Sequence, residues 1–227
     1  MNSKNKDSFW PSYVDIMTTL FAIMVVLFAV SYSRFRIKEA ELRKIADKYE
    51  EIKQIYQTVE NIDSTYFEFD STYVKHIFKI QVTYQTGAFS LYRLLADHND
   101  KSAADSLRNE IIDAGEEIRR TVQFLQNRND IIQDIKYLVV IEGQASADGY
   151  NTDEYHNNDV LSYKRALELH KFWQRNNIDF TSMPKCELVI SGSGEGGVPR
   201  DKYNEVYNQR FLIHIVPVIG NIRLNGD

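Results

Sequence analysis

The sequence predicts an α/β protein made of a single transmembrane helix, an amphipathic linker helix, and a compact domain of β-α-β-α-β-β order whose helices pack on its sheet. Three observations predict this. An apolar run near the N-terminus contains a single charge, several later segments carry apolar residues at steps of three and four, and short strand-like runs alternate with them. A chain of 227 residues accommodates one ordinary domain and such additional segments.

The composition excludes several functional classes. The single cysteine, Cys186, rules out an internal disulfide framework and a multi-cysteine zinc site. A net charge of −5 argues against a nucleic-acid partner. The five histidines lack metal-ligand spacing, and the glycine-rich stretch 191–197 lacks the Lys-Ser/Thr ending of a phosphate-binding loop. We therefore expect no enzymatic activity, no metal and no cofactor.

The transmembrane helix is predicted at residues 13–33. Residues 16–33 carry no charge, and about 20 apolar residues suffice to cross a bilayer. A cleaved signal peptide is the alternative, but the apolar run continues directly into Arg34 and Arg36 without a small-residue cleavage site. The run therefore indicates a retained anchor, which leaves residues 1–12 as a short N-terminal segment.

Asp15 is the only charged residue of this span. An ionisable side chain inside a membrane is costly and often marks an ion path. Thr18 and Thr19 lie on the same helical side, where small and hydroxyl side chains let other helices approach. Residue chemistry alone leaves a second interpretation equally open, in which Asp15 lies near the headgroups and is simply hydrated.

The charges that flank the span predict how the chain is oriented in the membrane. The N-terminal flank carries Lys4 and Lys6, whereas the C-terminal flank carries five basic residues between Arg34 and Lys44. The positive-inside rule applied alone would keep the C-terminal part in the cytoplasm.

Beyond the span, residues 34–78 are predicted to form a linker with an amphipathic helix over 34–63, which is a candidate plug, and a short strand at 66–70. The compact domain is predicted at 79–218, followed by a tail at 219–227. Within the domain the expected strands are 79–84, 137–141, 186–191 and 211–216, and the expected helices are 103–127 and 160–176. The continuously apolar strand 137–141 suggests coverage on both faces, and residues 144–159 form a polar loop.

Several stretches of this domain resemble the OmpA C-terminal-like peptidoglycan-binding family. They are IEGQASADG at 141–149, NDVLSYKRA at 158–166, ISGSGEGGVP at 190–199 and NQRF at 208–211. In that family an aspartate and an arginine bind the diaminopimelate of the peptide stem. The resemblance places Asn158, Leu161, Arg165 and Arg210 on family positions. The family aspartate falls on Ser146, so that Asp148 or Asp153 would have to supply the missing charge. A structural salt bridge is the alternative role for Arg165.

The N-terminal span resembles the helix of flagellar stator B subunits (MotB) and is more similar to the B subunit of the Zorya anti-phage defence system (ZorB). This resemblance implies an inner-membrane, single-pass, dimeric stator subunit with a cytoplasmic N-terminus and a periplasmic domain. It also implies a multi-span MotA- or ZorA-like ring partner, and a proton, or else sodium, carried by Asp15 with help from Thr18 and Thr19. Three alternatives remain: a flagellar stator, a non-conducting tether between membrane and wall, and an energising subunit of the ExbD type.

Overall fold

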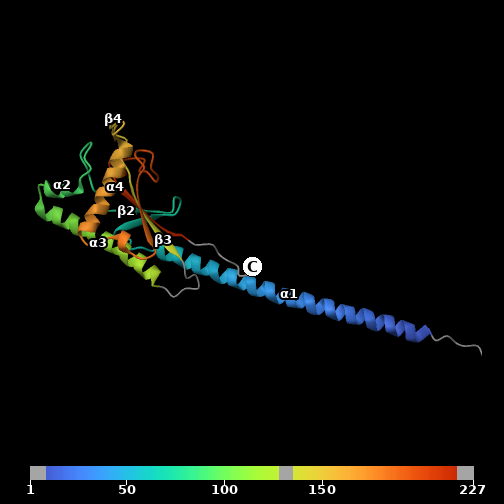
Figure 1. Cartoon of the computed structure of the whole chain (residues 1–227). Helices are drawn as coiled ribbons and strands as arrows, with labels where there is room; N and C mark the ends of the chain where they lie inside the picture. Colours follow the sequence, from blue (N-terminus) through green and yellow to red (C-terminus); the bar gives the residue numbers. More distant parts are fainter. Residues whose placement is uncertain (1–8, 128–134, 219–227) are drawn as a thin grey trace, which may run out of the picture. The chain divides into compact units, whose positions relative to one another are not determined.

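A computed structural model describes residues 9–127 and 135–218 (Figure 1). The expected tail, residues 219–227, and the basic residues Lys4 and Lys6 lie outside the described part. The chain divides into two compact units, one comprising residues 1–50 and 224–227 and the other residues 51–223, and each is described by itself.

The first unit is formed by most of helix α1 (Phe9–Glu60), whose last ten residues belong to the second unit. The expected span and linker helix are therefore one continuous helix. Apolar side chains of the span are exposed in the isolated chain, as at Phe21 (68%) and Phe28 (72%). Within residues 9–127 and 135–218, α1 is the one helix long and apolar enough to cross a membrane.

The second unit contains a five-stranded mixed sheet in the order β1-β2-β7-β3-β6. All neighbouring pairs are antiparallel except β3 and β6, which are parallel and are connected through α4. Along the sequence, a separate β4–β5 hairpin follows β3 and precedes α4. The elements are β1 (Phe67–Asp70), β2 (Lys75–Phe78), α2 (Leu91–Ala96), α3 (Lys101–Gln126), β3 (Lys136–Gly143), β4 (Asn151–Asp153), β5 (His156–Asn157), α4 (Asn158–Arg175), β6 (Cys186–Gly192) and β7 (Phe211–Val218), with 3-10 turns η1 (Phe180–Ser182) and η2 (Glu205–Asn208).

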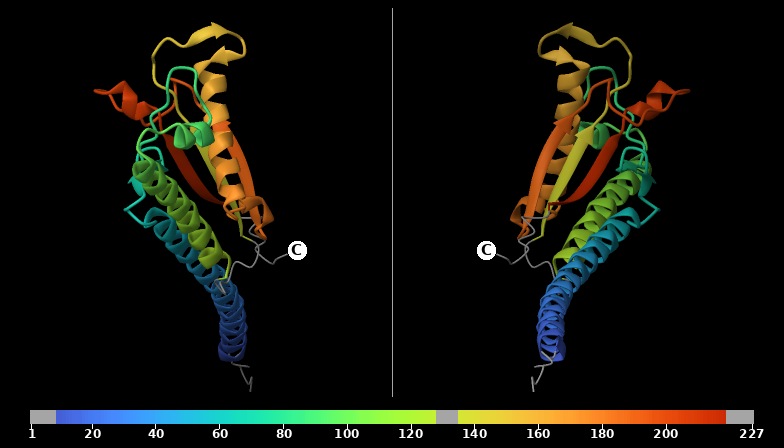
Figure 2. Two further views of the ribbon diagram at one scale, coloured as in Figure 1. Left: turned by 90° about the vertical axis from the view of Figure 1, so that its left-hand side faces the viewer. Right: turned by 90° about the vertical axis from the view of Figure 1, so that its right-hand side faces the viewer.

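The helices pack against the sheet (Figure 2). The core lies between them, and Trp173 of α4 is fully buried in it. Its indole Nε1 donates a 2.7 Å hydrogen bond to the carbonyl of Ile111 in α3, and its ring contacts Phe78 of β2. Gly115 of α3 lets the two helices approach, because a Cβ there would lie 2.5 Å from Trp173 Nε1. The predicted apolar faces of both helices are confirmed. The buried residues of these faces are Ile111, Ala114, Ile118, Val122 and Leu125 of α3, and Leu161, Ala166, Leu169 and Trp173 of α4.

The expectation that β3 is covered on both faces is wrong. Tyr137, Val139 and Ile141 are buried under the helices, whereas Val140 on the opposite face is only half-buried. The strands on either side of β3 leave that second face open too, since Val189 of β6 and Val216 of β7 are 38% and 37% exposed. The end of α1, α3 and α4 all pack on one side, so a run of apolar residues here marks a central strand rather than a doubly covered one.

The strand expected at 79–84 is also misplaced, because the strand next to β7 is β2, at Lys75–Phe78. Residues 79–84 have no regular secondary structure, but Ile80, Val82 and Tyr84 are buried, which explains the alternating pattern. Their backbone forms no ladder with another described strand, and the Tyr84 amide donates instead to the Gln209 side chain at 3.0 Å. The strand expected at 66–70 is confirmed as β1, and those expected at 137–141, 186–191 and 211–216 are confirmed as β3, β6 and β7.

Candidate functional site

The three candidate ion-path residues lie on consecutive turns of α1. Thr18 Oγ1 donates to the carbonyl of Val14 at 2.7 Å, and Thr19 Oγ1 donates to the carbonyl of Asp15 at 2.8 Å. Both hydroxyls are therefore satisfied by their own helix, as is common for threonine in membrane helices. The Asp15 side chain is exposed in the isolated chain, so any shielding from lipid has to come from other subunits.

The candidate wall site is built where the parallel strands β3 and β6 end. The carboxyl ends of neighbouring parallel strands meet at one edge of a sheet, and ligands commonly bind there. The loop after β3 carries Ser146 and Asp148, the loop after β6 carries Glu195, and α4 begins beside them at Asn158. The crossover from β3 through α4 to β6 therefore brings together residues that are far apart in the sequence.

Ser146 is buried and bonded to the groups around it. Its Oγ donates to Asp148 Oδ2 at 3.2 Å and accepts from Gln209 Nε2 at 3.1 Å. The Asp148 carboxylate is exposed and also accepts the backbone N–H of Tyr150 at 3.1 Å. Ser146 therefore helps to hold the carboxylate of Asp148, two residues further along the loop, in place.

Asn158 joins the two loops. Its Nδ2 is directed at the Ser146 carbonyl (3.1 Å), Asp148 Oδ1 (3.4 Å) and Glu195 Oε2 (3.5 Å). The residue is 6% exposed, and its Oδ1 is buried without a hydrogen-bond partner among the described residues. Buried polar atoms are nearly always paired, so this oxygen is one of the few exceptions among the described residues.

Glu195 is the residue that the sequence did not assign to the site. Its exposed side chain is placed by Gly194, whose N–H donates to Ser162 Oγ at 2.9 Å and whose carbonyl accepts from the Ala145 N–H at 2.9 Å. Gly194 has a φ of +55°, and a Cβ there would lie 1.9 Å from Asp159 Oδ1. Only glycine lets this loop approach the start of α4 so closely.

Arg165 is 2% exposed and holds the segment before α2 against α4. Its Nε donates to the Ala88 carbonyl at 3.0 Å, and its guanidinium lies over the Tyr84 ring at 4.5 Å from the centroid. Burial lowers the pKa of Arg165 from its usual value. The structure gives it no ion pair among the described residues, and its Nη1 is buried without a partner there. Leu161 lies one turn earlier on α4 and is buried in the core.

Arg210 does not join this group. Its Nε donates to Gln144 Oε1 at 3.0 Å and its Nη2 to the Pro199 carbonyl at 2.7 Å, so it braces the loop after β6. Asp153 is also engaged elsewhere, because it accepts from its own hairpin and lies 2.9 Å from His156 Nδ1. The structure therefore brings Ser146, Asp148 and Asn158 together through hydrogen bonds, places Leu161 and Arg165 on the helix that Asn158 begins, and gives Arg210 other hydrogen-bond partners.

An ion cluster supports the same loop from the open face of the sheet. Glu142 Oε2 accepts from Lys75 Nζ and lies close to His214 Nε2, both at 2.9 Å. Burial alone would raise the pKa of Glu142, but the hydrogen bonds from His214, Lys75 and Ser193 lower it to about 2. Lys75 Nζ also donates to the Val198 carbonyl at 2.8 Å, which ties the loop after β6 to β2.

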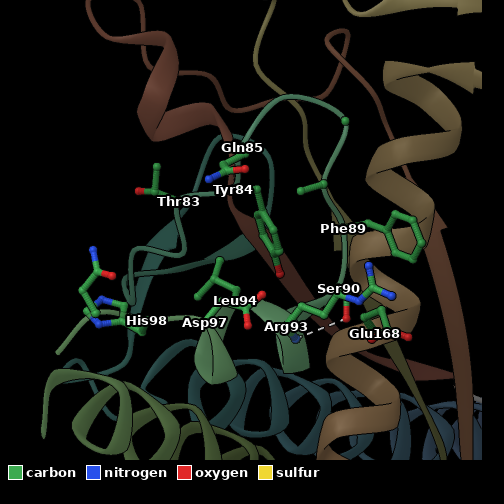
Figure 3. A pocket seen from close by; sticks show the side chains of 13 residues that line it. Thr83, Tyr84, Gln85, Phe89, Ser90, Arg93, Leu94, Asp97, His98 and Glu168 are labelled. Carbon is green, nitrogen blue, oxygen red and sulfur yellow. Dashed lines mark hydrogen bonds between the residues drawn. The ribbon is translucent and has the colours of Figure 1, made fainter. Parts of the chain in front are cut away.

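A cavity of about 790 Å³ lies beyond Arg165, between the segment 83–90, α2 and α4 (Figure 3). Tyr84 is at its centre and its ring reaches toward α2, with Thr83 and Gln85 above and Glu168 on α4. The Tyr84 hydroxyl is buried without a hydrogen-bond partner in the described structure, and burial raises its pKa. None of the predicted site residues lines this cavity. Among the residues that the structure covers, no cluster of three or more His, Cys, Asp or Glu side chains could hold a metal ion.

Comparisons with known proteins give only distant similarity. No protein-family model matches the sequence, and the curated proteins give no match. Among solved structures, the chain is similar to the cell wall anchor of the T6SS from Pseudomonas aeruginosa, with 14% identity, a TM-score of 0.38, and coverage of 71% of this chain and 94% of that one. It is also similar to a MotB-like protein from Desulfovibrio vulgaris, with 19% identity, a TM-score of 0.36, and coverage of 78% and 91%.

Proposed function

We propose that this chain is a membrane-anchored, wall-binding stator subunit of an ion-driven rotary motor, most similar in design to the B subunit of a Zorya-type defence complex. The observation that carries the proposal is the joining, in one chain, of an exposed apolar span, in which Asp15 is the single carboxylate, to an α/β domain with charged groups at the ends of β3 and β6. The resemblance of the span and of the four domain stretches supports the same function.

The ion step belongs to Asp15. A carboxylate held among protein helices in a bilayer can take up and release a proton, or else sodium, because the neutral and charged states differ strongly in solvation. Moving one charge through 100 mV yields about 2.3 kcal/mol. A multi-span MotA- or ZorA-like ring around a dimer of this chain would convert that energy into rotation. The wall-bound domain would keep this chain stationary.

The proposed topology places the N-terminus in the cytoplasm and residues 51–223 in the periplasm, because a wall-binding domain has to lie outside the cytoplasm. It overrides the orientation suggested by the basic residues that follow the span. A cysteine or epitope at residue 227 that was accessible only from the cytoplasm would contradict this topology.

Asp15→Asn is the decisive variant, because it keeps the size of the side chain and removes its charge. With the multi-span partner in vesicles, we expect ion flux to fall by about tenfold or more, and Asp15→Glu to retain part of it. Asp105→Asn is the control, since Asp105 is an exposed carboxylate of α3, outside both the span and the candidate plug. Unchanged flux in Asp15→Asn would refute the motor function and favour the alternative of a non-conducting tether, which the satisfied hydroxyls of Thr18 and Thr19 also permit.

A further inference from the structure

Aromatic side chains at both ends of the apolar span set the depth of α1 in a bilayer. The rings of Trp10 and Tyr13 meet at one end with centroids 6.4 Å apart, and those of Phe28 and Tyr32 stack at the other at 6.3 Å. Trp and Tyr rings concentrate at the two membrane–water interfaces. At about 1.5 Å per residue, Trp10 and Tyr32 are about 33 Å apart along the helix, close to the hydrocarbon thickness of about 30 Å. The residues after Tyr32 therefore enter the headgroup layer.

A group of basic side chains begins at this depth. Arg34, Arg36 and Lys38 are exposed and directly follow the uncharged part of the span. Arg36 has an acidic partner, because its Nη1 lies 3.4 Å from Glu39 Oε2. The other oxygen of Glu39 lies 2.7 Å from Arg43 Nη2. The Glu39 carboxylate is therefore already shared between two arginines.

Arg34 and Lys38 have no such partner. Neither makes a hydrogen bond or an ion pair with another residue that the structure describes, although Glu41 follows Lys38 by three positions. Because they are four residues apart, they lie one above the other on the same side of the helix, where like charges are destabilising. A bound anion removes this repulsion. Phosphate suits the pair, because a guanidinium donates two parallel N–H bonds to it and an ammonium adds a compact point charge.

A bilayer supplies phosphate groups at the same depth. Anionic phospholipids attract basic residues close to the membrane surface, and each such residue strengthens the association by about fivefold. The proposed topology places Arg34 and Lys38 on the periplasmic side, which the positive-inside rule disfavours. Lipid phosphates are present in both leaflets, so they can balance these charges in that orientation.

We propose that Arg34 and Lys38 form a phosphate-binding pair for the headgroup of an anionic phospholipid. The inference rests on the membrane span of the proposed function, and on neither its ion step nor its wall site. The ligand is a lipid rather than an acidic segment of a partner subunit, because the pair directly follows the apolar run and lies at headgroup depth. The bound lipid fixes the depth of the helix in the membrane.

The test measures the lipid preference of the full chain in vesicles. The reporter is Leu27→Trp in a Trp10→Phe background, since Leu27 is exposed and lies two turns before Arg34 on the same side of the helix. Quenching by brominated phosphatidylglycerol, compared with brominated phosphatidylcholine, gives the relative association of the two lipids beside the pair. At about fivefold per basic residue, we expect a preference for phosphatidylglycerol of about 25-fold. Arg34→Gln and Lys38→Gln should each reduce it to about fivefold, and the double variant should have no preference.

Lys44→Gln is the matched control. Lys44 is exposed and lies about 15 Å further along the helix than Arg34, beyond a Debye length of about 10 Å at 0.1 M salt. Its preference should equal that of the parent chain, and Lys38→Arg should keep the preference too, because a guanidinium also binds phosphate. An equal loss in Lys44→Gln, or no preference in the parent chain, would overturn the inference.

The same measurement with the multi-span partner reconstituted separates the lipid from a protein ligand. We expect the preference to persist. If it disappears when the partner is added, an acidic surface of that partner occupies the pair and the lipid assignment is wrong. Failure of the motor proposal is distinguishable, because Asp15→Asn with unchanged ion flux and unchanged lipid preference would refute the motor and leave the phosphate-binding pair standing.

Discussion

The Glu142 cluster allows a quantitative test of how the fold supports the candidate site. The Glu142 side chain is 8% exposed, and its pKa is held at about 2, compared with 4.5 for a free glutamate, by hydrogen bonds from His214, Lys75 and Ser193. At about 1.4 kcal/mol per pH unit, this corresponds to about 3 kcal/mol of stability at neutral pH. Because the folded pKa is depressed, the contribution is complete above pH 4.5 and is lost as the pH falls toward 2. About 2 kcal/mol of it should be gone by pH 3.

The variant is Glu142→Gln, and the assay is denaturant unfolding in detergent micelles, followed by tryptophan fluorescence. The chain has two tryptophans, so a Trp10→Phe background leaves buried Trp173 as the only reporter of the second unit. We expect the variant to lose about 3 kcal/mol at pH 7, and the gap to the parent chain to shrink between pH 4.5 and 2. If both chains lose stability in parallel over that range, the cluster does not act as described.

Two further changes test the packing around the site. Gly115→Ala should lower the free energy of unfolding by about 1–3 kcal/mol, because the new Cβ would lie 2.5 Å from Trp173 Nε1. Denaturant unfolding measures this loss. An unchanged midpoint would contradict the close packing of α3 on α4. Tyr84→Phe should be neutral or stabilising by up to about 1 kcal/mol, since it removes a buried hydroxyl without a described partner and keeps the ring beneath Arg165. A clear loss of thermal stability in Tyr84→Phe would show that the hydroxyl is bonded.

Much of the fold could be predicted because its longer elements bury one regular face. The apolar spacing in α3 and α4 and the strand-rich runs of β3, β6 and β7 follow from local sequence alone. The errors arose where the pattern of apolar residues indicates which side chains are buried but not which strands pair. Residues 79–84 alternate because three of them are buried, yet their backbone has no strand partner in the described structure. The helix α2 is too short to give a periodic signal, and the β4–β5 hairpin is both short and polar.

The candidate site was predictable only in part, because it is assembled by tertiary contacts. The motif around Asn158 and Arg165 is contiguous in sequence and could be recognised. Glu195 lies 37 residues from Asn158, and its position depends on the hydrogen bond from Gly194 to Ser162, which composition does not reveal. The glycine-rich stretch around it was a signal, since a positive φ and a close approach both require glycine. Arg210 matched the same pattern, yet its guanidinium donates to the Pro199 carbonyl in the loop after β6.

The parallel pairing of β3 and β6 has an evolutionary consequence. The loops that follow β3 and β6 leave the same end of the sheet side by side. Each loop begins at the end of a strand whose register is fixed by its pairing with the other strand. An acidic side chain can therefore be lost from one loop and regained on the other without disturbing the scaffold. Homologues that share a ligand need not share the position of the residue that binds it. A sequence alignment that compares one position at a time would then suggest that ligand binding has been lost when it has been retained.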